Sequence, residues 1–132
     1  MKKLTKALQF EIAKRLATKG YFTDEQVAGF QKRGNKGMIA EMLLAEKLEL
    51  NTSFDNKQGE DLVYRGIKVQ FKFMGFGSSP SATETKKAVD ENEKEFVERI
   101  LEKYSEVDEF WIYAENDLDL ELEKMYQLTR NQ

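Results

Sequence analysis

A carboxylate, a carboxamide and an ammonium group occur close together in this chain, at Asp61, Gln70 and Lys72. The stretch predicts two strands joined by a tight turn at 65–66, which sets Asp61 and Gln70 on neighbouring strands. Side chains alternate between the faces of a strand, so Gln70 and Lys72 share one face. The other face carries four apolar residues: Ile67, Val69, Phe71 and Phe73. The three polar groups are within reach of one metal ion, which suits metal-assisted phosphodiester cleavage.

Each of these groups has a candidate role in such a reaction. Mg²⁺ prefers one or two carboxylates and keeps several waters. Asp61 would supply the carboxylate, Gln70 an amide oxygen, and the main chain of Phe71 a carbonyl oxygen. Lys72 would face the scissile phosphate, orient or deprotonate the attacking water and offset the developing charge. The alternative is that Lys68, Gln70 and Lys72 form the solvent face of an amphipathic edge strand, which alternation alone favours.

A glutamate upstream strengthens the first interpretation. Residues 37–48 are apolar around most of a helix circumference, and Glu41 falls among these apolar positions. Such a helix is expected to be buried against the sheet, where a glutamate needs a partner, and a metal would be one. Glu46 and Glu49 also have apolar neighbours, so periodicity does not single out Glu41. The alternative for Glu41 is a glutamate at the rim of the core that extends into solvent.

The composition removes several other chemistries. The 132 residues include no cysteine and no histidine, which excludes thiolate nucleophiles, Ser-His-Asp hydrolases and nearly all imidazole-dependent metal sites. Any metal would be held by oxygen ligands, so we expect Mg²⁺ or Mn²⁺. The length suits one domain. No apolar run approaches the roughly 18–20 residues of a membrane span, and the N-terminus lacks the apolar segment of a signal peptide. We therefore expect a cytoplasmic protein with no membrane partner.

Charge is divided along the chain. Residues 1–38 contain nine Lys and Arg against three acidic residues, a net charge of +6, while residues 90–123 contain fourteen acidic residues and three basic ones, a net charge of −11. The basic part could follow a phosphate backbone while the acidic part faces away from it. The alternative for each part is a solvated helix face.

Two segments are the candidate DNA contacts. The first is the basic cluster just before the glutamate-bearing helix, Lys32, Arg33 and Lys36, which we expect to contact backbone phosphates without reading sequence. The second is the glycine-containing loop after the lysine strand, which includes Ser78 and Ser79 and could close over nucleic acid. A plain solvated loop is the alternative for both.

Apolar periodicity and turn residues predict the elements that position these groups. Three helices are predicted first: one over 3–19, one that starts at a capping box of Thr23 and Gln26 and ends near residue 32, and one over 36–49. Two strands over 61–73 follow, then a loop over 75–81, a helix over 84–104, a central strand over 110–114 and an edge strand near 125–128. The first helix should bury a stripe of Leu4, Leu8, Ile12 and Leu16. This order predicts an α/β protein built around a small mixed sheet.

Together, Glu41 on a helix, Asp61, and Gln70-Phe71-Lys72 resemble the PD-(D/E)xK nuclease superfamily. The resemblance covers roughly residues 37–113. The Gln-x-Lys form is similar to Mrr-type restriction enzymes, and the spacing and size are similar to Holliday junction resolvases and phage nucleases. Two departures are Glu60 in place of the family's proline, and Gln70 in place of its glutamate, which removes one negative charge from the site.

The resemblance implies a three-layer restriction-endonuclease-like fold in a single domain, in which helices flank a small mixed β-sheet, with a basic helical part over 1–36 and an α-β-β-α-β core over 37–128. It implies that Glu41, Asp61, Gln70 and the Phe71 carbonyl bind Mg²⁺ or Mn²⁺, and that Lys72 is the catalytic lysine. The implied function is a DNA endonuclease acting through metal-activated water, structure-specific or working as a homodimer or within a larger complex. Two alternatives are an inactive nuclease fold that only binds nucleic acid, and an interaction module that uses an acidic helix over 90–109.

Overall fold

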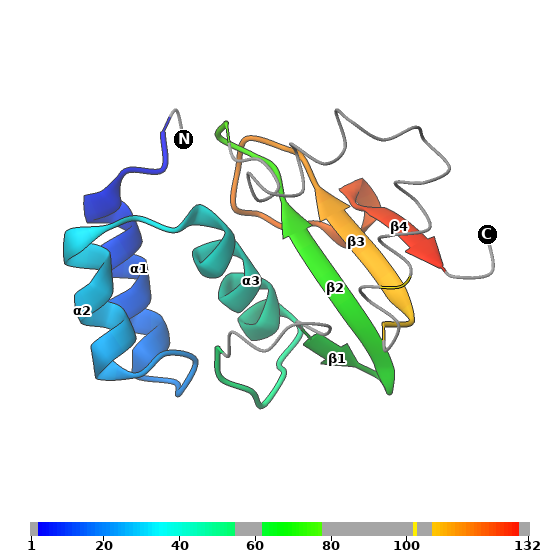
Figure 1. Ribbon diagram of the computed structural model, residues 1–132, viewed down its shortest axis with the longest axis horizontal. Helices are drawn as coiled ribbons and strands as arrows, with labels where there is room; N and C mark the ends of the chain where they lie inside the picture. The colour runs from blue at the N-terminus through cyan, green and yellow to red at the C-terminus, as the bar shows by residue number, and fades with distance from the viewer. Residues whose placement is uncertain (1–2, 55–61, 78–101, 103–106, 130–132) are drawn as a thin grey trace.

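Three helices precede a four-stranded mixed sheet in the computed structural model, which describes residues 3–54, 62–77, 102 and 107–129 (Figure 1). In chain order the elements are α1 (Lys6–Ala17), α2 (Asp24–Lys32), α3 (Lys36–Lys47), β1 (Leu62–Tyr64), β2 (Ile67–Phe73), β3 (Glu109–Tyr113), the short 3-10 helix η1 (Leu122–Lys124) and β4 (Tyr126–Thr129). The protein is thus of mixed α/β class, as the element order predicts. The helix predicted over 84–104 lies outside the described residues except for Glu102, which is helical.

The sheet has the order β1-β2-β3-β4, so β2 and β3 are interior strands and β4 lies at an edge. β2 pairs antiparallel with β1 and parallel with β3, and β3 pairs antiparallel with β4. The predicted hairpin is confirmed: Tyr64 pairs with Ile67, and Arg65 and Gly66 both have positive φ, 52° and 80°. Two consecutive positive φ angles define the turn that matches the natural twist of a two-residue hairpin.

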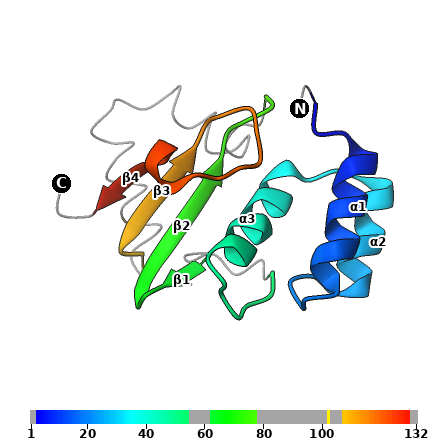
Figure 2. The ribbon, with the colours of Figure 1, turned by 180° about the vertical axis from the view of Figure 1, so that it is seen from behind.

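The helix α3 forms a middle layer between the α1–α2 pair and the sheet (Figures 1 and 2). It packs on α1 with one side and on β2 with the other, which explains why it is apolar around most of its circumference. One hydrophobic core runs through these layers and includes Trp111 and Tyr113 of β3. Among the described helices, none is long and apolar enough to cross a membrane.

Caps decide where the first helices begin. Thr5 caps α1, accepting a hydrogen bond from the Leu8 main-chain N–H, so this helix starts later than the predicted residue 3. The predicted capping box of α2 is confirmed: the Thr23 N–H donates to Oε1 of Gln26 (2.8 Å), and the Gln26 N–H donates to Oγ1 of Thr23 (3.1 Å). Helix α3 begins at the predicted residue but ends at Lys47, and Glu49 beyond it has a φ of +56°.

The predicted apolar stripe of α1 is only partly right. Leu4 and Leu16 are buried, but Leu8 and Ile12 are only half-buried, and Gln9 and Ala13 occupy the buried positions between them. Two helices, α2 and α3, pack on α1. The buried line of α1 therefore follows its contacts rather than its most apolar residues.

Candidate active site on strand β2

Gln70 and Lys72 lie on the same face of an interior strand. Gln70 is opposite Phe110 in the parallel pairing of β2 with β3, and Lys72 is opposite Ile112. Gln70 is only 5% exposed and Lys72 is half-buried. The alternative of an exposed face on an edge strand is therefore wrong, because strands flank β2 on both sides and Gln70 is withdrawn from solvent.

Phe71 projects to the opposite face, where its ring is buried in the core with Val69 and Phe73. The predicted ligand at this position is its main-chain carbonyl. The carboxylate predicted for the metal, Asp61, lies outside the described residues and directly precedes Leu62, the partner of Val69. Among the residues that the structure does describe, no cluster of three or more acidic side chains could hold a metal ion.

Glu41 is buried on α3, with 8% of its surface exposed, so the alternative of a solvent-exposed rim glutamate is wrong. The side of α3 on which Glu41 lies can be worked out from Glu46, whose side chain binds α1. Five residues separate the two glutamates, and at about 100° per residue this places Glu41 about 140° around the helix from Glu46. Glu41 therefore lies on a different side of α3 from the side that binds α1. Tertiary contacts thus separate two glutamates that periodicity treats alike.

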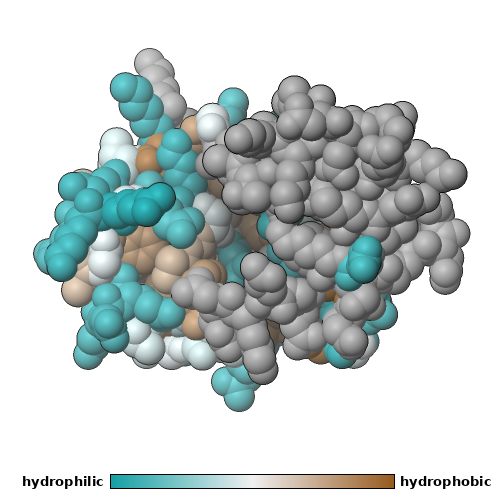
Figure 3. Space-filling view, in the orientation of Figure 1, coloured by the Kyte–Doolittle hydropathy of each residue, from teal (hydrophilic) through white to brown (hydrophobic). Residues whose placement is uncertain are grey.

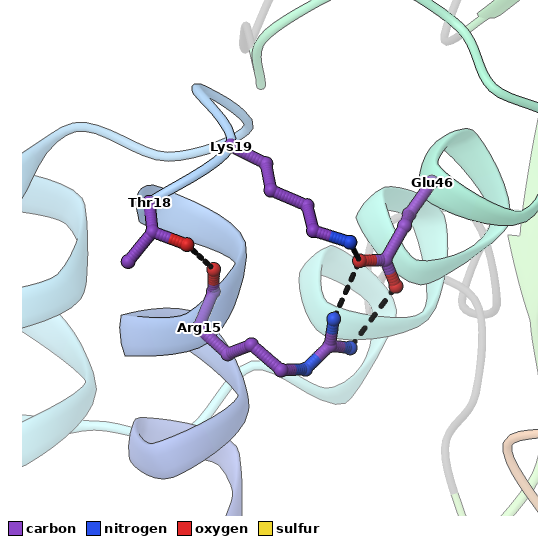
Figure 4. A network of polar contacts seen from close by, with 4 residues as sticks. All are labelled: Arg15, Thr18, Lys19 and Glu46. Carbon is purple, nitrogen blue, oxygen red and sulfur yellow. Dashed lines mark hydrogen bonds and ion pairs between the residues drawn. The ribbon is translucent and has the colours of Figure 1, made fainter.

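An ion-pair cluster holds α3 to α1 and explains Glu46 (Figure 4). Both terminal nitrogens of Arg15 donate to its carboxylate, Nη2 to Oε1 at 3.0 Å, and Nζ of Lys19 donates to Oε2 at 2.8 Å. The hydrogen bond from Arg15 holds the pKa of Glu46 below its ordinary value, against the effect of burial, and the same bond raises the pKa of Arg15. This cluster is a structural clamp between two layers rather than part of the candidate site.

A second clamp accounts for Gln9, which sequence reasoning did not single out. Its Nε2 donates to the Leu4 carbonyl (3.1 Å), and its Oε1 accepts from the main-chain N–H of Asn35 (2.6 Å). Gly34 passes so close that a Cβ atom there would lie 3.0 Å from the Gln9 amide. The side chain therefore ties the start of α1 to the connection between α2 and α3. Glutamine in a helix of ordinary composition carries no signal that would reveal this role.

The carboxyl ends of β2 and β3 are fastened to each other and to the start of α3. The Met74 N–H donates to the Tyr113 carbonyl (2.8 Å), and the Phe76 N–H donates to Oδ1 of Asn116 (2.7 Å). Nζ of Lys36 donates to the Phe76 carbonyl at 2.7 Å. A Cβ atom on Gly75 would come within 2.1 Å of the Glu115 carbonyl oxygen, so only glycine allows this approach. Lys36 is therefore half-buried and engaged with the main chain, and not simply an exposed phosphate contact.

The segment after β3 is held by a buried phenol. The hydroxyl of Tyr113 donates to Oδ1 of Asp117, whose other contact is the Asp119 N–H at 3.0 Å. Burial, and then the hydrogen bond to Asp117, raise the pKa of the Tyr113 phenol, while the Tyr113 bond lowers the pKa of Asp117. Nζ of Lys47 on α3 binds the Asp119 carbonyl. These contacts position the loop beside the carboxyl end of β2.

The remaining predicted contacts to nucleic acid divide into two groups. Lys32 and Arg33 are exposed where α2 leads into α3, as a phosphate contact requires. Ser78 and Ser79 lie outside the described residues.

No protein-family model, curated protein or solved structure matches this chain.

Proposed function

We propose that the protein is a Mg²⁺-dependent DNA endonuclease of the PD-(D/E)xK type, which hydrolyses phosphodiester bonds by metal-activated water. The observation that carries the proposal is the placement of a buried Gln70 and a half-buried Lys72 on one face of an interior strand. A half-buried lysine beside a buried amide is unusual on a strand, since both groups lose hydration there.

The buried polar residues support this choice. Three polar or charged side chains are buried among the described residues, namely Gln9, Glu41 and Gln70. Gln9 has a structural role as the clamp between α1 and the α2–α3 connection. The other two, Glu41 and Gln70, are the two buried side chains that the sequence proposes as metal ligands. Exclusion of water from such a site strengthens every electrostatic interaction in it.

Each residue then has a defined task. Glu41, Asp61, Gln70 and the Phe71 carbonyl would hold the ion, with Gln70 contributing an oxygen that carries no charge. Bound there, Mg²⁺ would polarise the phosphodiester and activate a water molecule. Lys72, two residues along the same face and so about 6.6 Å from Gln70 by strand geometry, would orient that water and offset the charge that develops on the phosphate. Two copies acting together would cut both strands of a duplex.

A cleavage assay with Mg²⁺ or Mn²⁺ on supercoiled, linear, single-stranded and branched DNA tests the proposal. Lys72→Ala and Asp61→Ala are expected to lose about 100-fold or more of the cleavage rate. Lys68→Ala is the matched control, because Lys68 is another half-buried lysine on the same face of β2, towards its amino end. Loss of activity in all three variants alike, or in none, would overturn the assignment.

A second candidate is a nuclease-like fold that binds DNA without cutting it. The observation in its favour is the neutral Gln70, which reduces the charge available to hold a divalent ion. Salt-sensitive DNA binding that survives Lys72→Ala, with no cleavage by the wild type on any substrate, would favour this candidate.

A further inference from the structure

Four exposed basic side chains gather at one end of the helical layers. They are Lys3 and Lys6 at the start of α1, and Lys32 and Arg33 at the end of α2, and we call this group the basic end. The Gln9 clamp brings the two segments together, because Gln9 binds both the Leu4 carbonyl and the Asn35 N–H. Lys3 and Lys6 belong to the basic part over residues 1–38, but the sequence did not single them out as DNA contacts.

The charge of the basic end is not offset by the acidic residues near it in the sequence. None of its four side chains forms an ion pair within the described part of the chain. Glu11 on α1 is bound to Lys14 at 2.9 Å, and the two acidic residues of α2, Asp24 and Glu25, lie in its first turn at the opposite end of that helix. Like charges are thus held close together at a cost in stability, which an anion would relieve.

The basic end lies at the same end of the molecule as the carboxyl end of β2 (Figures 1 and 2). The start of α1, the end of α2, the start of α3 and the end of β2 all lie at the same end of the molecule in both ribbon views (Figures 1 and 2). The bond from Lys36 to the Phe76 carbonyl joins the helical layers to the strand at this end. On the sheet side of this end, the carboxylate of Asp117 already accepts a hydrogen bond from the Tyr113 hydroxyl. In the space-filling view, hydrophilic side chains extend outward along the border of the helical layers (Figure 3).

We propose that the basic end binds the phosphate backbone of duplex DNA as it leaves the site on β2. This inference rests on the proposed function and adds a substrate requirement to it. Two layer spacings of about 10 Å each separate the α1–α2 pair from the sheet. A duplex that reaches both surfaces must therefore extend about six base pairs beyond the scissile phosphate, at about 3.4 Å per base pair.

The test is a binding titration with a duplex of about 24 base pairs, measured by fluorescence anisotropy. Cleavage is prevented by EDTA and by the Lys72→Ala substitution, which all the proteins carry. Each of Lys3→Gln, Lys6→Gln, Lys32→Gln and Arg33→Gln is expected to weaken binding about threefold and to reduce the salt slope by about 0.9. The matched controls are Lys14→Gln and Lys124→Gln, which remove lysines already paired with Glu11 and Glu121. They should change the dissociation constant less than the basic-end variants do.

Lys6→Glu separates binding from folding. Lys6 is the first residue of α1, and no acidic residue stands in the first turn of this helix. A glutamate there is favourable for the helix dipole, so the melting temperature should rise by about one to two degrees. DNA binding should fall more than in Lys6→Gln. A variant that is more stable yet binds less tightly cannot be explained by unfolding.

The outcomes distinguish this inference from the proposed function. Normal cleavage with unchanged affinity in the basic-end variants would overturn the inference and leave the nuclease intact. Binding that depends on the basic end, with no cleavage by the wild type, would support the inference and remove the nuclease. The inference would also be overturned if the wild type binds no duplex at low salt. If the same residues instead capture an acidic protein, the basic end belongs to a protein partner and the inference is wrong.

Discussion

Lys36, the first residue of α3, donates a hydrogen bond from Nζ to the main-chain carbonyl of Phe76, just beyond the end of β2. This contact spans forty positions of sequence and fixes the glutamate-bearing helix relative to the strand that carries Gln70 and Lys72. The lysine thus has a structural role at the border between the basic end and the candidate site.

Lys36→Met keeps the aliphatic stem and removes the hydrogen bond. The free energy of unfolding is expected to fall by about 1 kcal/mol, as measured in urea titrations, because the Phe76 carbonyl loses its donor. Lys32→Met is the control, since Lys32 is exposed and should change stability by no more than about 0.5 kcal/mol. Equal effects of the two substitutions would contradict the role given to Lys36.

Acid should weaken the clamp between α1 and α3. The pKa of Glu46 is lowered in the folded protein by its hydrogen bond from Arg15, so the folded state binds this proton less readily than the unfolded chain. The stabilisation is complete above the ordinary value of 4.5 and is lost as the pH falls through the lowered pKa. We expect about 1 kcal/mol, because Arg15 and Lys19 are half exposed to solvent.

Glu46→Gln should lose that stabilisation at neutral pH, and its stability should then decline less than that of the wild type on acidification. Urea unfolding at neutral pH and at about pH 3.5 measures both. Glu123→Gln, at an exposed position in η1, serves as the control. A pH dependence in Glu46→Gln as steep as in the wild type would show that the clamp carries no such energy.

Two glycines should respond to alanine in opposite directions. A Cβ atom on Gly75 would overlap the Glu115 carbonyl oxygen, so Gly75→Ala must push apart the ends of β2 and β3 and should cost more than about 3 kcal/mol. Nothing lies within 4 Å of the corresponding position at Gly29, inside α2, where alanine should stabilise by about 0.5–1 kcal/mol. Thermal unfolding gives both signs, and a tolerant Gly75→Ala would argue against the close approach.

Gln9 and Gly34 should be energetically coupled. Gln9→Ala removes two hydrogen bonds at a buried position and is expected to cost about 2–3 kcal/mol. Gly34→Ala alone forces the Gln9 amide to move, because a Cβ atom would lie 3.0 Å from it. In the double variant the crowding disappears, so the cost of Gly34→Ala should shrink. A double-mutant cycle on unfolding free energies measures this, and strictly additive values would rule out the contact.

Gln70→Glu tests the metal site independently of cleavage. A carboxylate at this buried position should lower the melting temperature in EDTA, since a buried charge is costly, and should bind Mg²⁺ more tightly than the amide does. The rise in melting temperature on adding Mg²⁺ should therefore exceed that of the wild type. Gln70→Leu, with no oxygen ligand, should show the smallest rise. The same response to Mg²⁺ in all three proteins would remove Gln70 from the metal site.

Local chemistry accounts for what the sequence predicted correctly. Arg65-Gly66 can adopt two successive positive φ angles, so the hairpin and the alternation of β2 follow from neighbouring residues. The capping box at Thr23 and Gln26 is likewise local. The composition without cysteine or histidine limits any metal site to oxygen ligands, and the apolar circumference of residues 37–48 indicates a helix covered on more than one side.

Only the tertiary structure decided which polar side chains are buried and where they point. The parallel pairing of β2 with β3 makes β2 an interior strand, tertiary packing leaves Gln70 only 5% exposed, and the contact of α1 with one side of α3 distinguishes Glu46 from Glu41. Likewise, the Gln9 clamp brings the start of α1 to the connection before α3 and so creates the basic end. Such relationships depend on contacts between residues far apart in the chain, which periodicity and local turn chemistry do not encode.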